Sequence, residues 1–453
     1  MSVSFDIKNF NDEESKKINE LLTFLPTEPT TKKFNPSMRF QSNGAAVRMI
    51  YYSEGEVHLP YRFACSYYSK FFNHDTSKYI NIHEKRQKFS GKLLDRQKEP
   101  FKRAVEYLKE YRTVTIALYP GFGKTFMGVM LSWYINKITC VLVHRENIGK
   151  QWVKTFLKYM DLTKDEVWFV NDKVPLQPKI MVCMDGRIDK IPKHIRENIG
   201  TLIIDEAHCF CAPGKVKSLL KLTPSYIIAE TATPTKENGL HKVIQSICGT
   251  HYIKETSTKP YNFFLIQTNL TFQTSGGNPY GQLLNEQCES QERNELIMEI
   301  LKANQDKKTM IATARTQHCE VLKSMIKENG LDSSELYGTI KNYQTKNILI
   351  GTGSKMGVGF DEANFCDDYD GRPSDLLLMC YTFASWAPFE QVRGRGMRTD
   401  SPNIVMFNDK HGITRKHFTQ IRKWVRETNG QIVELNVDKM DHFDLKKYTK
   451  KCH

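Results

Sequence analysis

Two short strings about eighty residues apart carry residue types suited to phosphate chemistry. The first is Gly121-Phe122-Gly123-Lys124-Thr125, and the second is Asp205-Glu206-Ala207-His208. Glycines let backbone N–H groups close on phosphate oxygens, and a helix start behind them favours anions. Carboxylates at a strand end can hold a metal ion and take a proton from water. Together the strings predict a site that hydrolyses a nucleoside triphosphate.

Each side chain in these strings has an expected role. Lys124 is predicted to reach the β- and γ-phosphates of ATP, and Thr125 to offer its hydroxyl to Mg²⁺. Asp205 is predicted to hold the same Mg²⁺, usually through water, and Glu206 to deprotonate the attacking water. The pattern GxxxxGK[ST] is not fully met, because Leu118 stands where its first glycine would be. A chance acidic pair at a strand end is the alternative reading of the second string.

The elements around the strings predict an α/β fold. Short apolar runs rich in β-branched residues alternate with helical stretches, which is the pattern of βαβ units and parallel sheets. The first string follows the run 114–118 and the second follows 201–204. Further strands are predicted at 139–143, 179–183, 225–229, 309–313, 348–352, 376–380 and 403–407. Helices are predicted at about 316–328 and, with one apolar face, at 412–428.

A third string, Gln391-Val392-Arg393-Gly394-Arg395-Gly396-Met397-Arg398, lies in the second half of the chain. Gln391, Arg395 and Arg398 fall on one side of a helical turn or its flank. Arginines from a second domain can neutralise charge that develops as the γ-phosphate leaves. Closure of the two domains would then be a condition of hydrolysis, which is how a triphosphatase becomes a motor on nucleic acid. A basic surface helix is the alternative, although it does not explain the two glycines.

Composition limits the class of protein and of partner. At 453 residues the chain is long enough for two or three domains. Its net charge of +14 favours polyanionic partners, nucleic acid first, unless the excess only serves solubility. The eleven cysteines include no CxxC pair, so no structural zinc is expected, and reduced thiols fit a cytosol-like compartment. We find no signal peptide and no apolar run long enough to span a membrane, so a cytoplasmic location is expected.

Four regions are expected. They are an N-terminal accessory domain at 1–88, two motor domains at 89–254 and 255–410, and a basic C-terminal helix and tail at 411–453. In the first region, apolar runs at 47–50 and 57–59 flank a turn at 53–56 and predict a hairpin. Aromatic residues crowd together at 61–72, where they form a small core or stack on bases.

The motifs together resemble the superfamily 2 helicases of the DExH type. The resemblance covers about 90 to 410 and implies two RecA-like domains in tandem, with a small N-terminal α+β domain. It implies that Gln97 reads adenine, that Asp361 contacts the ribose, and that Gly121, Phe122 and Gly123 cradle phosphate. It further implies that Arg145 and Thr352 touch the nucleic-acid backbone. Glu230-Thr231-Ala232-Thr233-Pro234 resembles the coupling motif, with Thr231 in the serine position. The string from Val143 to Trp152 resembles the first motif that touches nucleic acid, and Met310 to Arg315 resembles the start of the second motor domain. His208 belongs to the catalytic string.

Within that superfamily, the architecture resembles the transcript-release DNA helicases of poxviruses and related large DNA viruses. The expected function is therefore that of an ATP- and Mg²⁺-dependent helicase or translocase on single-stranded or tailed duplex nucleic acid, with DNA favoured. A viral transcription complex is a candidate partner, and host cytoplasm or the virion a candidate location. Three alternatives stay open: a translocase that remodels a transcription complex without unwinding, an RNA helicase, and a nucleotide-switched binding scaffold with negligible turnover.

Overall fold

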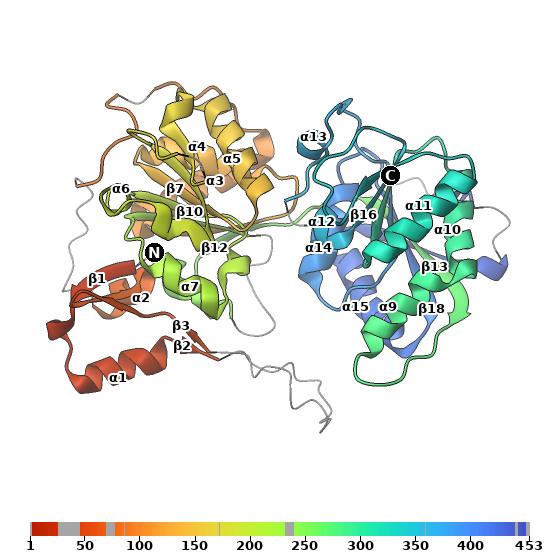
Figure 1. Ribbon diagram of the computed structural model, residues 1–453, viewed down its shortest axis with the longest axis horizontal. Helices are drawn as coiled ribbons and strands as arrows, with labels where there is room; N and C mark the ends of the chain where they lie inside the picture. The colour runs from red at the N-terminus through yellow and green to blue at the C-terminus, as the bar shows by residue number, and fades with distance from the viewer. Residues whose placement is uncertain are drawn as a thin grey trace. The chain divides into compact units, whose positions relative to one another are not determined.

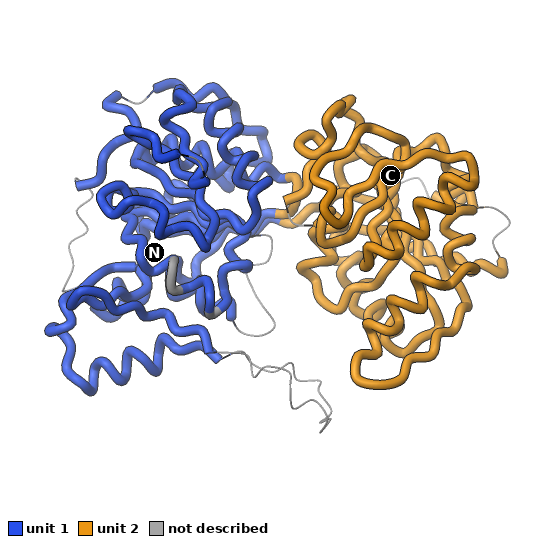
Figure 2. The backbone as a smooth tube through the Cα atoms, viewed as in Figure 1, with its two compact units in different colours: residues 1–118, 122–255 blue, residues 119–121, 256–453 orange. Residues whose placement is uncertain are grey.

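The chain folds into two compact units, each built on one parallel sheet. The computed structural model describes residues 2–25, 46–68, 78–85, 87–171, 173–231, 240–357, 359–439 and 443–449. Unit 1 comprises Met1–Leu118 and Phe122–Glu255, and unit 2 comprises Tyr119–Gly121 and Thr256–His453 (Figure 2). Each sheet has seven strands and carries helices on its faces (Figure 1). The predicted α/β fold with two parallel sheets in tandem is confirmed.

The sheet of unit 1 has the strand order β12-β6-β11-β10-β7-β9-β8. Its strands are β6 (Thr113–Leu118), β7 (Thr139–Val143), β8 (Val167–Phe169), β9 (Ile180–Met184), β10 (Thr201–Ile204), β11 (Tyr226–Thr231) and β12 (Tyr252–Glu255). The central strands are buried apolar runs, as expected where helices cover both faces. Because β11 lies between β6 and β10, the carboxyl ends of these three strands are neighbours.

Helices cover both faces of this sheet. On one face α3 (Asp95–Tyr111), α4 (Lys124–Ile135) and α5 (Glu146–Tyr159) pack against one another. On the other face α7 (Pro213–Leu220) and α8 (Lys242–Cys248) join one hydrophobic cluster, while the short α6 (Lys193–Arg196) precedes β10.

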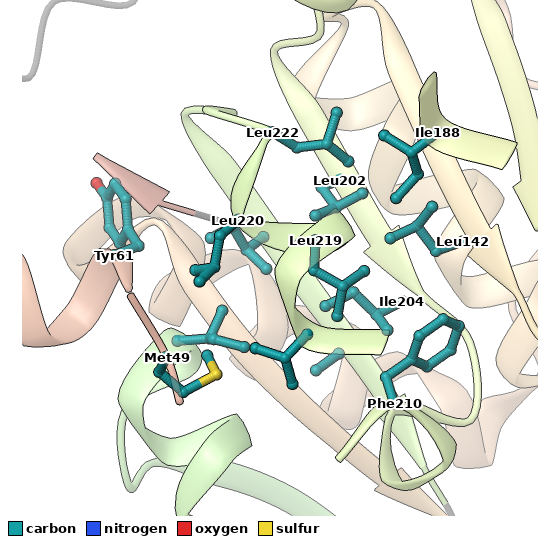
Figure 3. Close-up of a cluster of buried hydrophobic side chains, with 14 of the residues drawn as sticks. Met49, Tyr61, Leu142, Ile188, Leu202, Ile204, Phe210, Leu219, Leu220 and Leu222 are labelled. Atoms are coloured by element: carbon teal, nitrogen blue, oxygen red, sulfur yellow. The ribbon is translucent and has the colours of Figure 1, made fainter. Parts of the chain in front are cut away.

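The N-terminal region is part of unit 1 and shares its core. Met49 and Tyr61 belong to the same hydrophobic cluster as Leu202 and Ile204 (Figure 3). The elements of this region are β1 (Ser2–Asp6), α1 (Asp12–Leu21), β2 (Thr23–Phe24), β3 (Val47–Arg48), β4 (Tyr51–Ser53), β5 (Glu56–Pro60) and α2 (Tyr61–Tyr67).

The predicted hairpin is present in this region, but its first strand is displaced. β4 pairs with β5 around Glu54 and Gly55, whereas 47–48 pairs with β2 instead. The described aromatic residues mostly pack among themselves, with the rings of Phe5, Phe10 and Tyr68 in edge-on contact. This packing favours the small-core reading of the aromatic cluster; residues 71 and 72 lie outside the described residues.

Unit 2 repeats the parallel architecture, with the strand order β15-β16-β14-β17-β18-β13-β19. Its strands are β13 (Tyr261–Thr271), β14 (Thr309–Thr313), β15 (Ser333–Leu336), β16 (Ile348–Thr352), β17 (Leu376–Met379), β18 (Asn403–Lys410) and β19 (Gly430–Asn436). On one face lie α10 (Gln291–Ala303) and α11 (Thr316–Glu328), with α9 (Pro279–Glu289) beside α11. On the other lie α12 (Gly353–Met356), α14 (Trp386–Gly396) and α15 (Gly412–Glu427), and the short α13 (Glu362–Phe365) precedes β17.

The C-terminal region is more than a basic helix and tail. The predicted amphipathic helix is α15, whose Phe418, Ile421 and Val425 are buried against the sheet. It is followed by β19, which pairs in parallel with β13 at the edge of the sheet. This strand was not predicted from the sequence. Residues 411–436 thus complete the sheet of unit 2.

Candidate functional site

The glycine-containing string forms the connection between β6 and α4. Gly121 and Gly123 have φ angles of +84° and +102°, a region that side-chain-bearing residues rarely adopt. Helix α4 begins directly at Lys124, so its first N–H groups have no partner within the helix and face the turn. Lys124 Nζ donates to the carbonyl of Leu118 at 3.1 Å. A helix start with a lysine at its first position is suited to bind a phosphate group.

Gln97 of α3 lies directly against this turn. Its Nε2 donates to the carbonyl of Phe122 at 2.7 Å, and its Oε1 accepts from the N–H of Leu94 at 2.9 Å. A Cβ at position 123 would lie 2.5 Å from Gln97 Nε2, so only glycine leaves room for this contact. Gln97 is buried and fixes the turn; contact with an adenine stays a prediction.

The acidic string follows β10. Asp205 is 7% exposed, and its Oδ2 accepts a 2.8 Å hydrogen bond from the indole N–H of Trp152. Burial and the neighbouring Glu206 raise the pKa of Asp205, while the Trp152 hydrogen bond and the charge of Lys124 oppose this rise. Lys124 is therefore close enough to Asp205 for their charges to interact. The structure brings the phosphate turn and the first carboxylate of the acidic string together.

Glu206 has an unusual backbone conformation. Its φ and ψ angles of 49° and 54° lie in the left-handed region, which a residue with a side chain rarely occupies. Such backbone strain persists only where the surroundings impose it, and it occurs preferentially at functional sites. The conformation falls at the turn that joins β10 to the following 3₁₀ helix, Ala207–Phe210.

His208 connects the acidic string to the end of β11. Its Nδ1 is 3.0 Å from Thr231 Oγ1 and 3.4 Å from Glu206 Oε2. The imidazole ring therefore lies between the turn after β10 and the end of β11. Glu230 and Thr231 of the predicted coupling motif lie on β11, whereas Ala232, Thr233 and Pro234 lie outside the described residues.

The donor set at this edge fits a hydrated divalent cation. Oε2 of Glu206 and both carboxylate oxygens of Glu230 are buried and have no hydrogen-bond partner in the described structure. No three His, Cys, Asp or Glu side chains within the described ranges form a protein-only metal site. Mg²⁺ rarely uses such a site, because it keeps several waters and binds one or two carboxylates together with substrate phosphates. Asp205 and the hydroxyl of Thr125 at the start of α4 are suited to this role.

Two residues follow the carboxyl end of β7 at the same edge. Burial and the charge of Arg145 lower the pKa of His144 to about 4, so its ring is neutral near pH 7. Arg145 is the N-cap residue of α5. Trp152, at the end of the string predicted to touch nucleic acid, is fully buried and bonds Asp205 instead. That part of the string is inside unit 1 and is unavailable to a nucleic-acid strand.

In unit 2, Arg395 and Arg398 of the third string both contact the segment at the end of α12 and after it. Arg395 Nε donates to the carbonyls of Met356 and Gly357 at 3.2 and 3.1 Å. Arg398 pairs with Asp361 at 3.1 Å, so the predicted ribose contact and one predicted catalytic arginine lie together.

The helix that carries this string is internal to unit 2. From Phe389 to Gly396 every residue of α14 is buried, including Gln391, so α14 is not the basic surface helix considered above. Thr352, the predicted backbone contact, ends β16 and is also buried.

Three residues at the centre of the unit 1 site were not predicted to lie there. Trp152 bonds Asp205, Glu230 lies buried at the end of β11, and Gly128 of α4 lies against both of them. An acidic residue that ends a buried apolar run was the available signal for Glu230. The contact of Trp152 joins residues 53 positions apart and has no local signal in the sequence.

Comparisons with known sequences agree with this geometry. The sequence model of the family described as "Type III restriction enzyme, res subunit" matches residues 90–236. "Putative helicase 161L" of Invertebrate iridescent virus 6 is 26% identical over 380 residues, which cover 77% of this chain and 83% of the relative. "Putative helicase 055L" of Frog virus 3 is 22% identical over 346 residues, covering 73% and 77%.

A solved structure shares the fold. S. cerevisiae Dbp5 bound to RNA and ADP BeF3 superposes with a TM-score of 0.56 at 14% identity, covering 77% of this chain and 93% of Dbp5. Among the described residues, no helix combines the length and apolar character that a membrane crossing needs.

Proposed function

Because this chain is a helicase-type ATPase of superfamily 2, we propose that it uses ATP to move along nucleic acid and to separate its strands. The substrate is a single-stranded or tailed duplex nucleic acid, with DNA favoured. The observation that carries this proposal is that the string with Lys124 follows β6 and the string with Asp205 and Glu206 follows β10, on either side of β11 at the carboxyl edge of one parallel sheet. Ligands of open parallel sheets bind at that edge.

The chain's own residues divide the work of hydrolysis. Lys124 and the N–H groups at the start of α4 bind the β- and γ-phosphates. Asp205 and Thr125 hold Mg²⁺, which when bound neutralises charge on the phosphate oxygens. Glu206 orients the attacking water and accepts its proton. Its buried Oε2 has no hydrogen-bond partner in the described structure, so this oxygen is able to accept a hydrogen bond from the attacking water.

The contact between His208 and Thr231 can link the hydrolysis site to the predicted coupling motif. The ring bonds Thr231 and lies beside the carboxylate of Glu206, so movement of Glu206 on hydrolysis alters the support of Thr231. Thr231 ends β11 and leads into the rest of the predicted coupling motif. We propose that the contact between His208 and Thr231 couples ATP hydrolysis to the affinity for nucleic acid.

The preference for DNA rests on the resemblance to DNA helicases, while the charge of +14 supports nucleic acid of either kind. Remodelling of a viral transcription complex is the process that the resemblance favours. Contacts to phosphates alone do not distinguish DNA from RNA, so the test compares both.

The test measures ATP hydrolysis by the full chain with single-stranded DNA, duplex DNA and RNA in parallel. Strand separation is then followed on duplexes with a 3′ or a 5′ tail. Glu206→Gln is the matched inactive control, because it keeps the shape of the side chain. We expect DNA to stimulate hydrolysis and one tail polarity to support unwinding. Stimulation by RNA alone overturns the DNA preference, and hydrolysis without strand separation restricts the function to translocation.

A further inference from the structure

Glu230 occupies the position between the phosphate turn and Asp205. It lies on β11, whose neighbours in the sheet are β6 and β10. In the parallel register Ala229 pairs with Ile204, so Glu230 and Asp205 are the next residues of adjacent strands. On the other side Glu230 pairs with Ile116 of β6, two residues before that strand ends. Glu230 is therefore an acidic residue in the middle strand of the candidate site.

The surroundings of Glu230 leave its carboxylate without compensation. The side chain is fully buried, and neither oxygen has a hydrogen-bond partner in the described structure. A Cβ at Gly128 would lie 2.6 Å from Glu230 Oε1 and 2.6 Å from the ring of Trp152, so glycine leaves space for both side chains. Burying a carboxyl group without a partner costs several kcal/mol (roughly 2–7 for a neutral polar group and more for an ion), and such a group is retained where a ligand uses it.

The nearby charges point to a cationic ligand. Burial and the charges of Asp205 and Glu206 raise the pKa of Glu230 well above its ordinary value, and Lys124 opposes the rise. Among the described residues no ion pair joins Glu230 to Lys124, whose Nζ donates to the carbonyl of Leu118 instead. Glu230 is thus the partner of no basic side chain in the described structure. A cation that enters with a nucleotide would supply the missing positive charge.

We propose that Glu230 is a third acidic group of the nucleotide site, which accepts hydrogen bonds from the water shell of nucleotide-bound Mg²⁺ and selects metal-bound over metal-free nucleotide. The inference rests on the proposed function. An ionised carboxylate only accepts hydrogen bonds, and Mg²⁺ keeps several of its waters as donors.

The test is calorimetric binding of AMP-PNP to the full chain, once with excess Mg²⁺ and once with EDTA. The readout is the affinity measured with Mg²⁺ divided by the affinity measured in EDTA. In Glu230→Gln we expect this ratio to fall about tenfold or more, the usual effect of losing a group that orients a metal site. Affinity with Mg²⁺ should fall, and affinity in EDTA should stay near the wild-type value. A Mn²⁺ titration followed by electron paramagnetic resonance gives the metal affinity directly and should show the same loss.

A matched control is available in unit 2. Glu362 is as buried as Glu230, but its carboxylate is bonded by Ser374. Glu362→Gln should leave the affinity ratio at the wild-type value. Glu230→Asp keeps the charge with a shorter reach and should give a ratio between those of wild type and Glu230→Gln. Thermal unfolding without nucleotide should show Glu230→Gln to be no less stable than wild type, because an unpaired buried acid has been removed.

The outcomes separate this inference from the proposed function. If Lys124→Ala abolishes AMP-PNP binding while Glu230→Gln leaves the ratio unchanged, the site is correct and the role of Glu230 is wrong. If Lys124→Ala binds AMP-PNP as wild type does, both are wrong. If Glu230→Gln does not fold, the ratio in Glu230→Asp decides, and a wild-type ratio there overturns the inference.

Discussion

The indole N–H of Trp152 donates a 2.8 Å hydrogen bond to Oδ2 of Asp205 in the interior of unit 1. Trp152 comes from α5 and is fully buried, so the direction of the bond is fixed by packing. A hydrogen bond to a buried carboxylate both orients it and favours its ionised form. Trp152 therefore orients Asp205 and favours its ionised form, which the metal-binding role proposed for Asp205 requires.

Trp152→Phe is expected to weaken metal use more than nucleotide use. The ring is kept, but Asp205 loses its donor, so the Mg²⁺ concentration for half-maximal hydrolysis should rise roughly tenfold. Titration of Mg²⁺ at saturating ATP measures this shift. Trp133→Phe is the matched control, since the Trp133 indole donates to the carbonyl of Gln87 at 2.7 Å. An equal Mg²⁺ requirement in both variants would contradict a positioning role for Trp152.

Glu206→Gln is expected to separate binding from hydrolysis. The substitution keeps the shape of the side chain and removes the proton acceptor, so ATP affinity should stay near the wild-type value. The rate of hydrolysis should fall by about 10² to 10⁴, the usual contribution of a general base. Single-turnover hydrolysis and equilibrium binding of ATP measure the two effects. Hydrolysis at the wild-type rate would show that another group takes the proton.

Arg393 and Arg395 are expected to respond differently to substitution. Arg393 is fully buried and pairs with Glu390 through bonds of 2.6 and 2.8 Å, so Arg393→Met leaves a buried charge unpaired. Breaking such a pair costs about 3–5 kcal/mol of unfolding free energy. Arg395→Lys keeps a charge and should instead lower stimulated hydrolysis with a smaller loss of stability.

Denaturant unfolding and ATPase rates at saturating DNA distinguish these two arginines. Adding Glu390→Leu to Arg393→Met should restore part of the lost stability, because both charges are then removed. Recovery of the Arg395→Lys rate on adding more DNA would make Arg395 a strand contact and contradict the catalytic role predicted for it.

The sequence predicted those parts of the fold that have a strong local signal. Runs such as Thr139–Val143 are β-branched, apolar and bounded by helical stretches, and they form the central strands. The polar β15 (Ser333–Leu336) and the half-exposed edge strand β19 gave no such signal. The place of β19 in the sheet depends on its pairing with β13, which lies far away in the sequence, so the residues around β19 do not indicate it.

The candidate site was predictable where function dictates a residue type at a fixed spacing. Lys124 and Asp205 follow from their strings, but their neighbours Trp152 and Gly128 follow only from packing. Helical spacing placed Arg395, and not Arg393, on the same side as Gln391 and Arg398, but it did not predict what either arginine contacts. The difference lies in their partners, a carboxylate for Arg393 and backbone carbonyls for Arg395.

Arg145→Ala is expected to reduce nucleic-acid binding through its charge. Each phosphate that a basic side chain neutralises adds about 0.7 to the log–log salt slope for a single strand. The variant should therefore bind all base sequences more weakly and lower the slope by about that amount. Lys150→Ala, on the same helix and paired with Glu146, is the matched control. Salt titrations of a fluorescent oligonucleotide measure both slopes, and identical slopes would remove Arg145 from the interface.

His318 is expected to make unit 2 sensitive to acid. Its Nε2 lies 2.9 Å from Asn294 Oδ1, and burial together with the charge of Arg293 lowers its pKa to about 3. The unfolded chain binds a proton near pH 6.5, whereas the folded chain does not, so stability is lost as pH falls from about 6.5 towards 3. The loss approaches about 1.4 kcal/mol per pH unit. Above pH 6.5 this group contributes no pH dependence.

His318→Gln should remove this contribution, because glutamine can still donate to Asn294 and does not titrate. Urea unfolding at pH 7.5 and 5.5 measures the difference for each protein. Wild type should lose about 1.4 kcal/mol more than the variant between these values, since His318 is protonated over about one pH unit in the unfolded chain only. His318→Asn is too short to keep the bond and should be less stable at both pH values, which separates the hydrogen bond from the titration. An equal loss in wild type and His318→Gln would show that His318 is protonated in the folded protein as well.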